Sequence, residues 1–69
     1  MRLTCEVELE TDGRWLAEIV ELPGVLAYGD DAEQALAAAK ALALRVLAER
    51  IEQGEDPRAM DGVEFVRAA

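Results

Sequence analysis

The chain has 69 residues, 52% of them hydrophobic, and its 15 acidic and 7 basic residues give a formal net charge of −8 at pH 7. This length allows one domain over residues 1–69. The charge argues against direct binding of DNA or RNA, which requires clustered Lys and Arg. A basic protein partner suits the charge better, because opposite fields speed encounter. The same charge would also keep a small protein in solution, so charge alone does not choose between these roles.

Cysteine usage and hydropathy indicate the compartment. Cys5 is the only cysteine, so no internal disulfide can form. The first residues alternate between polar and apolar, unlike the unbroken apolar block of a signal peptide. No apolar stretch approaches the roughly 20 residues that span a bilayer. We therefore expect a cytoplasmic protein without membrane contact.

The first predicted element is a strand from Leu3 to Leu9. Every second residue of it is apolar, namely Leu3, Cys5, Val7 and Leu9. The residues between and after them are Thr4, Glu6, Glu8 and Glu10. A period of two places these sets on opposite faces, so the strand is half-solvated. Cys5 is interpreted as a small core residue.

A hairpin and a turn follow in the next twenty residues. Asp12-Gly13 predicts a hairpin, because Gly readily supplies the positive φ that tight hairpin turns require. The return strand runs over residues 14–20, and Pro23-Gly24 predicts another turn. A short third strand covers residues 25–28 and ends at Gly29. The three strands form an antiparallel meander.

A long helix is predicted from Ala32 to about Gln53. Asp31 suits its N-cap, and Gln34 completes a capping box three residues later. The segment contains neither Gly nor Pro and is rich in Ala and Leu. Gly54 stands where a left-handed C-cap belongs, and Pro57 opposes resumption of the helix.

The tail is predicted to form a loop over residues 55–61 and a fourth strand over residues 63–66. A right-handed crossover through the helix would make this strand parallel to the first. The expected order is third, second, first, fourth, with the helix on one face. The fold class is α+β, with the element order β-β-β-α-β.

The sequence offers little for catalysis. It contains no histidine, so a thiol–imidazole pair cannot form, and the commonest metal ligand is missing. Glu6, Glu8 and Glu10 follow one strand face, where neighbours lie about 7 Å apart, and this favours a solvated face over a two-metal site. We expect no enzyme activity, cofactor or metal. A degenerate nuclease is the weakest alternative, because acidic clusters can hold divalent metals.

One apolar set has no place in the core. If Val25 and Ala27 face the helix, the face away from it carries Leu16, Val20, Leu26 and Tyr28. Contiguous apolar patches of this kind mark association surfaces. Trp15 shares its strand face with Ala17 and is expected to pack on the core rather than in a contact. A chain of this size buries only about 60% of its unfolded surface, which also favours self-association as a homodimer or larger oligomer.

The order and spacing of several short motifs resemble the HicB-like antitoxin family. They are Asp12-Gly13, Trp15-Leu16-Ala17, Glu21-Leu22-Pro23-Gly24, Ala27-Tyr28-Gly29-Asp30 and Ala32-Glu33-Gln34-Ala35. The resemblance covers roughly residues 3–54. It implies a reduced ribonuclease-H-like module that binds a small basic HicA-like toxin, an RNA-cleaving protein with a double-stranded-RNA-binding fold. Many members append a DNA-binding domain, for which this chain has no room.

The favoured hypothesis is an acidic, homo-oligomeric, antitoxin-like module that neutralises a small basic RNA-cleaving toxin. Its interface would consist of Leu16, Val20, Leu26 and Tyr28, with Glu6, Glu8 and Glu10 steering the encounter. The alternative is a stand-alone homo-oligomeric structural or regulatory domain, without a toxin, that self-associates through the same apolar face.

Overall fold

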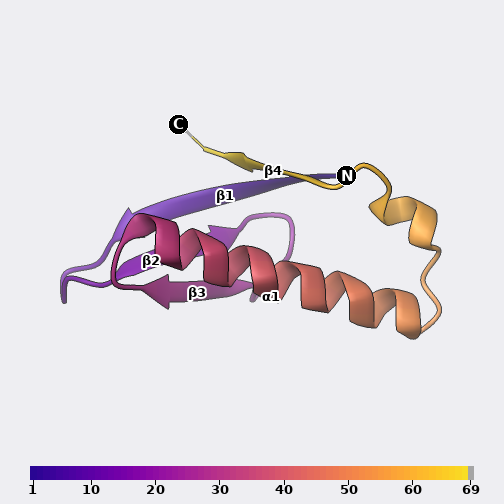
Figure 1. Ribbon diagram of the computed structural model, residues 1–69, viewed down its shortest axis with the longest axis horizontal. Coiled ribbons are helices and arrows are strands. Elements are labelled where there is room, and N and C mark those ends of the chain that lie inside the picture. Colours follow the sequence, from indigo (N-terminus) through magenta and orange to yellow (C-terminus); the bar gives the residue numbers. More distant parts are fainter. Residues whose placement is uncertain (69) are drawn as a thin grey trace.

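The computed structural model describes residues 1–68 and places one long helix on a four-stranded sheet (Figure 1). The elements are β1 (Arg2–Leu9), β2 (Trp15–Ile19), β3 (Leu26–Gly29), α1 (Ala32–Glu52), the short 3-10 helix η1 (Pro57–Met60) and β4 (Glu64–Arg67). The strand order is β3-β2-β1-β4. β4 is parallel to β1, whereas the other neighbours are antiparallel. The α+β fold and the topology predicted from the sequence are confirmed.

The β1–β2 hairpin turns where Asp12-Gly13 predicts it. The Gly13 N–H donates to the Glu10 carbonyl at 3.0 Å, and the Glu10 N–H donates to the Arg14 carbonyl at 2.8 Å. Gly13 has φ +89°, the left-handed conformation that glycine adopts without steric cost. The loop is thus a turn followed by a left-handed residue, longer than the two-residue type. Its length sets the register, in which Leu9 lies opposite Trp15.

Both ends of α1 are capped by side-chain or backbone hydrogen bonds. Asp31 Oδ1 accepts from the Gln34 N–H at 2.7 Å, as a capping residue should. The side-chain oxygen of Gln34 accepts in turn from the Asp30 N–H at 3.3 Å. In a capping box it would accept from the N–H of the N-cap residue itself, which is Asp31. At the other end, the Glu55 N–H donates to the Arg50 carbonyl at 3.0 Å, the six-to-one bond of a Schellman motif.

The segment between α1 and β4 is more regular than the loop predicted there. Pro57 begins the 3-10 helix η1, and the Asp56 side chain caps it by accepting from the Arg58 N–H at 3.0 Å. Proline prevents continuation of α1, but its fixed φ suits the first residue of a new helical turn. The predicted fourth strand is present as Glu64–Arg67, and its first N–H donates to the Met1 carbonyl at 2.9 Å.

The core lies between α1 and the sheet face beneath it. Its fully buried members include Leu3, Cys5 and Ile19 from the strands. Gly29 allows the helix to approach closely, because a Cβ at this position would lie 2.4 Å from the Ala35 backbone nitrogen. Leu9 shares the alternation of the core residues of β1 but is 56% exposed. It is the last residue of β1, beside the hairpin loop, which extends beyond the start of α1 (Figure 1).

Candidate protein-binding face

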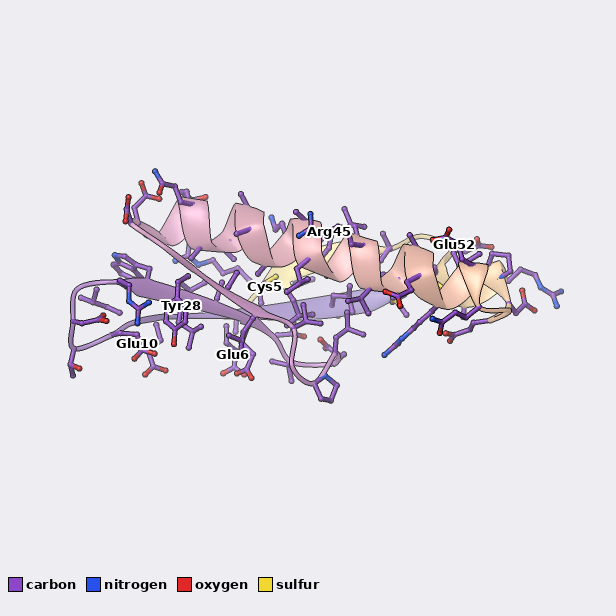
Figure 2. The ribbon with its side chains drawn as sticks, turned by 90° about the horizontal axis from the view of Figure 1, so that it is seen from below. Cys5, Glu6, Glu10, Tyr28, Arg45 and Glu52 are labelled. Carbon is purple, nitrogen blue, oxygen red and sulfur yellow. The ribbon has the colours of Figure 1, made fainter. Side chains whose placement is uncertain are left out.

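The sheet has a second face, which α1 does not cover. We call it the open face. It carries the side chains of β1, β2 and β3 that point away from the helix. Figure 2 shows Glu6, Glu10 and Tyr28 projecting from this side, whereas Cys5 lies between the sheet and α1. Five of the seven residues predicted for the interface lie in these strands, and the other two, Glu10 and Val20, directly follow β1 and β2. The structure thus brings the predicted site residues onto one face.

The apolar part of the open face matches the predicted patch. Val20, Leu26 and Tyr28 are 47%, 39% and 43% exposed, and Leu16 is half-buried. Leu16 lies opposite Tyr28 in the β2–β3 register. Val20 continues the patch past β2, because its N–H donates to the Thr4 carbonyl at 2.9 Å and holds this residue beside β1. We call these four residues the apolar patch.

The short third strand was the critical element of that prediction, because its orientation decides which side chains are exposed. Val25 is buried and Ala27 is half-buried against the core, whereas Leu26 and Tyr28 are exposed. The predicted alternation of residues 25–28 is confirmed. Trp15 is also placed as expected, partly buried against the core.

Tyr28 has a neighbour that the sequence did not reveal. The guanidinium carbon of Arg14 lies 4.1 Å from the centroid of the Tyr28 ring, a cation–π arrangement. The Arg14 backbone N–H donates to Asp12 Oδ1 at 3.1 Å and Arg14 Nε donates to Asp12 Oδ2 at 2.7 Å. These hydrogen bonds, the backbone one first, lower the pKa of the Asp12 carboxyl. The hairpin loop thereby holds a guanidinium over one end of the apolar patch.

The acidic part of the open face lies beside the patch. Glu6 is directly opposite Glu18, and Glu8 is directly opposite Leu16, in the β1–β2 register. Like charges in directly opposite positions destabilise a sheet. Within residues 1–68 the basic side chains of the ion pairs engage only Glu64, Asp12, Asp56 and Glu33. Glu6, Glu8 and Glu18 are exposed and Glu10 is half-buried. None of their carboxylates forms an ion pair in that part of the chain, and we call these four residues the acidic row.

Two of these acidic residues differ from the prediction in detail. Glu18 lies on this face because it alternates with the buried Ala17 and Ile19, but the interface prediction did not include it. Its role becomes visible only from its position opposite Glu6. Glu10 follows β1 and lies in the hairpin loop, so it stands at the margin of the acidic row.

Glu21 stabilises the turn that follows β2. Its carboxylate accepts from the Thr4 backbone N–H at 2.6 Å and from the Thr4 hydroxyl at 2.7 Å. These two hydrogen bonds, the backbone one first, lower the pKa of the Glu21 carboxyl. The contact fastens the chain after β2 to β1 and supports Val20, which lies just before Glu21.

The remaining chemical groups contribute less to a site. Burial raises the pKa of the Cys5 thiol, which belongs to the core. Residues 1–68 form no pocket and no group of three or more side chains that could hold a metal ion. Across the same residues no helix has the length and hydropathy to cross a membrane. The chemistry that the fold brings together is the juxtaposition of unpaired carboxylates and an apolar patch.

Comparison of the chain with protein-family models, with curated protein sequences and with solved structures gives no match. The resemblance to the HicB-like family accordingly stays a prediction.

Proposed function

We propose that this protein is a cytoplasmic protein-binding module whose open face docks a small basic partner. The HicB-like resemblance would make the partner an RNA-cleaving HicA-like toxin, which the module would neutralise by binding. The observation that carries the proposal is the pair Glu6 and Glu18, directly opposite each other beside exposed Leu26. This arrangement combines an unfavourable charge pair with apolar area that a partner could bury.

The energetics of the acidic row favour an external cation. A like-charge cross-strand pair costs on the order of 0.2–1 kcal/mol relative to neutral residues. Local unfavourable arrangements of this kind are expected at functional sites, where they are relieved by the ligand. A Lys or Arg between Glu6 and Glu18 would turn the repulsion into two charge-assisted contacts.

The apolar patch would supply the buried area of the complex, while the glutamates at its side would set partner choice and the rate of encounter. Tyr28 is the anchor we expect to dominate, because Tyr is enriched among the few residues that carry most binding energy. The guanidinium of Arg14 lies over the Tyr28 ring and restricts its motion, which reduces the entropy lost on binding.

The same charges oppose the alternative role, a stand-alone oligomer that joins two open faces. Two copies in face-to-face contact would bring the carboxylates of Glu6, Glu8 and Glu18 against their equivalents or, with the twofold axis along the strands, against the apolar patch. Like charges across an interface cost several kcal/mol. The open face therefore suits a basic partner better than a second copy.

The test uses the product of the neighbouring reading frame if it is a small, strongly basic protein. Its affinity for this chain is measured by calorimetry, and its RNA cleavage is measured with and without the chain. We expect tight binding and loss of cleavage. Glu6→Lys together with Glu18→Lys should weaken binding at least tenfold, whereas Glu52→Lys with Glu55→Lys, an equal change of charge away from the sheet, should have little effect.

Two results would contradict the proposal. Equal weakening by both pairs of substitutions would show that only net charge matters, and full RNA cleavage in the presence of the bound chain would remove the neutralising role.

A further inference from the structure

The outer edge of β3 has unused backbone groups. The Ile19 N–H donates to the Val25 carbonyl at 2.9 Å, so Val25 directs its backbone polar groups toward β2. Successive residues of a strand alternate in this direction. Ala27 and Gly29 therefore also bond toward β2, and the N–H and C=O groups of Leu26 and Tyr28 point outward. In the sheet of residues 1–68, β3 has only one neighbour, β2.

The two edges of the sheet differ in their protection against strand pairing. β4 carries charged residues at both ends, and these form ion pairs, Glu64 with Arg2 at 3.0 Å and Arg67 with Glu33 at 3.3 Å. Charged side chains on an edge discourage pairing with another chain. β3 has the sequence Leu-Ala-Tyr-Gly and contains neither a charged residue nor a proline. An unprotected edge of this kind is suited to a defined partner strand.

We propose that the partner strand is β3 of a second copy, paired antiparallel about a twofold axis through Ala27. In this register Leu26 of each copy lies opposite Tyr28 of the other. Their outward N–H and C=O groups then form four inter-chain hydrogen bonds and leave none of these groups unpaired. A twofold interface requires each surface to match a copy of itself. The outward groups of Leu26 and Tyr28 meet this requirement, because they lie symmetrically on either side of Ala27. The product is a continuous eight-stranded sheet.

The charges of the open face permit this mode, although they oppose face-to-face contact. Between Glu18 of one copy and Glu18 of the other would lie three strand spacings, about 14 Å. This exceeds the Debye length of about 8 Å at physiological ionic strength. On the same face, Leu26 of each copy would contact Tyr28 of the other. The two apolar patches would become one, with an acidic row on either side.

The test measures mass in solution by sedimentation over a range of concentrations, using the full chain. We expect reversible doubling from the 7.5 kDa of one chain. Leu26→Pro removes an outward N–H that β2 does not use, and edge strands tolerate this change. It should leave a monomer. Leu26→Thr keeps the N–H and should still dimerise. Equal masses for the two variants, or a monomeric parent at every concentration, would overturn the proposal.

A second measurement does not depend on the variants folding. Exchange of the Leu26 and Tyr28 amide hydrogens should slow as the concentration of the unmodified chain rises, because the dimer pairs them. Concentration-independent exchange at both amides would refute strand pairing. Abolition of the dimer by Leu44→Glu, a residue on the solvent side of α1 that is 48% exposed, would assign the contact to the helix instead. The proposed binding of a basic partner stands independently of these results.

Discussion

Glu6 and Glu18 face each other directly across β1 and β2 on the open face. Because opposite residues in a hydrogen-bonded antiparallel pair have Cα atoms about 5.5 Å apart, the two carboxylates share one small volume of solvent. The fold could remove this repulsion with a single basic residue, and the chain has none at either position. The pair connects the stability of the sheet to the proposed recognition of a basic protein.

Glu18→Lys should therefore stabilise the isolated protein while weakening its complex with a basic partner. The change replaces a repulsive cross-strand pair by an attractive one, and we expect a gain of about 0.2–1 kcal/mol in the free energy of unfolding. Urea denaturation measures the gain, which should shrink at high salt. Glu55→Lys has the same change of net charge in an exposed loop and serves as the control. Equal stabilisation by both would attribute the effect to net charge.

The stability of the protein should fall in acid partly through Glu21. Hydrogen bonds from the Thr4 N–H and hydroxyl lower the pKa of this carboxyl below its ordinary value of 4.5. A carboxyl with a depressed pKa in the folded state contributes stability above its unfolded pKa, and this contribution is lost as the pH falls through the folded pKa.

Glu21→Gln should consequently flatten the dependence of unfolding free energy on pH below about 4.5, while the slope near neutrality stays unchanged. The flattening is partial, because Asp12 and Asp56 also have lowered pKa values. Thr4→Val keeps the backbone donor and should produce a smaller effect. An identical acid profile for Glu21→Gln and the parent chain would contradict a role for this contact.

Gly29→Ala should destabilise the protein by about 1–3 kcal/mol, the usual cost of forced overpacking. The added Cβ would lie 2.4 Å from the Ala35 backbone nitrogen, and a helix backbone cannot yield as a flexible side chain can. Gly24→Ala separates this effect from backbone strain, because Gly24 has φ +84° and no atom within 4 Å of its added Cβ. The expected signature is that Gly29→Ala alone shifts α1, which the chemical shifts of the helix would report.

Particular residues show how far sequence reasoning reaches. The alternation in β1 and the Asp31 cap are local patterns, so the strand and the start of α1 were predictable within a residue or two. The apolar patch followed from the parity of residues 25–28. The pair of Glu6 and Glu18 was not predicted, because it depends on the hairpin register, and the register depends on a loop longer than the two residues of a tight turn.

The contacts of Arg14 with Tyr28 and of Glu21 with Thr4 were also missed. Each joins residues that are far apart in the sequence and of types that are ordinarily solvated. No periodic pattern encodes such a pair. The 3-10 helix η1 was read as a loop because Pro57 was treated only as a helix terminator, although proline is equally suited to open a helical turn.

Salt should distinguish the two proposed associations. The association rate with a basic partner depends on the field of Glu6, Glu8 and Glu18, and this field is screened beyond about 8 Å at physiological ionic strength. Raising salt from about 0.01 M to about 1 M should slow association at least tenfold, as measured by stopped-flow fluorescence anisotropy of a dye-labelled partner. The β3–β3 dimer depends mainly on backbone hydrogen bonds and apolar contact, so its dissociation constant should change little.

Val20→Ala provides the matched comparison for that measurement, since it removes apolar area from the open face without altering charge. It should raise the dissociation rate of the complex with the basic partner and leave the salt dependence of association intact. Val20 follows β2 and does not lie beside Leu26 and Tyr28, the residues that pair in the dimer. The dimer should therefore keep its affinity. A salt-insensitive association rate would separate the acidic row from recognition, and weakening of the dimer by Val20→Ala would place self-association on the open face instead of the β3 edge.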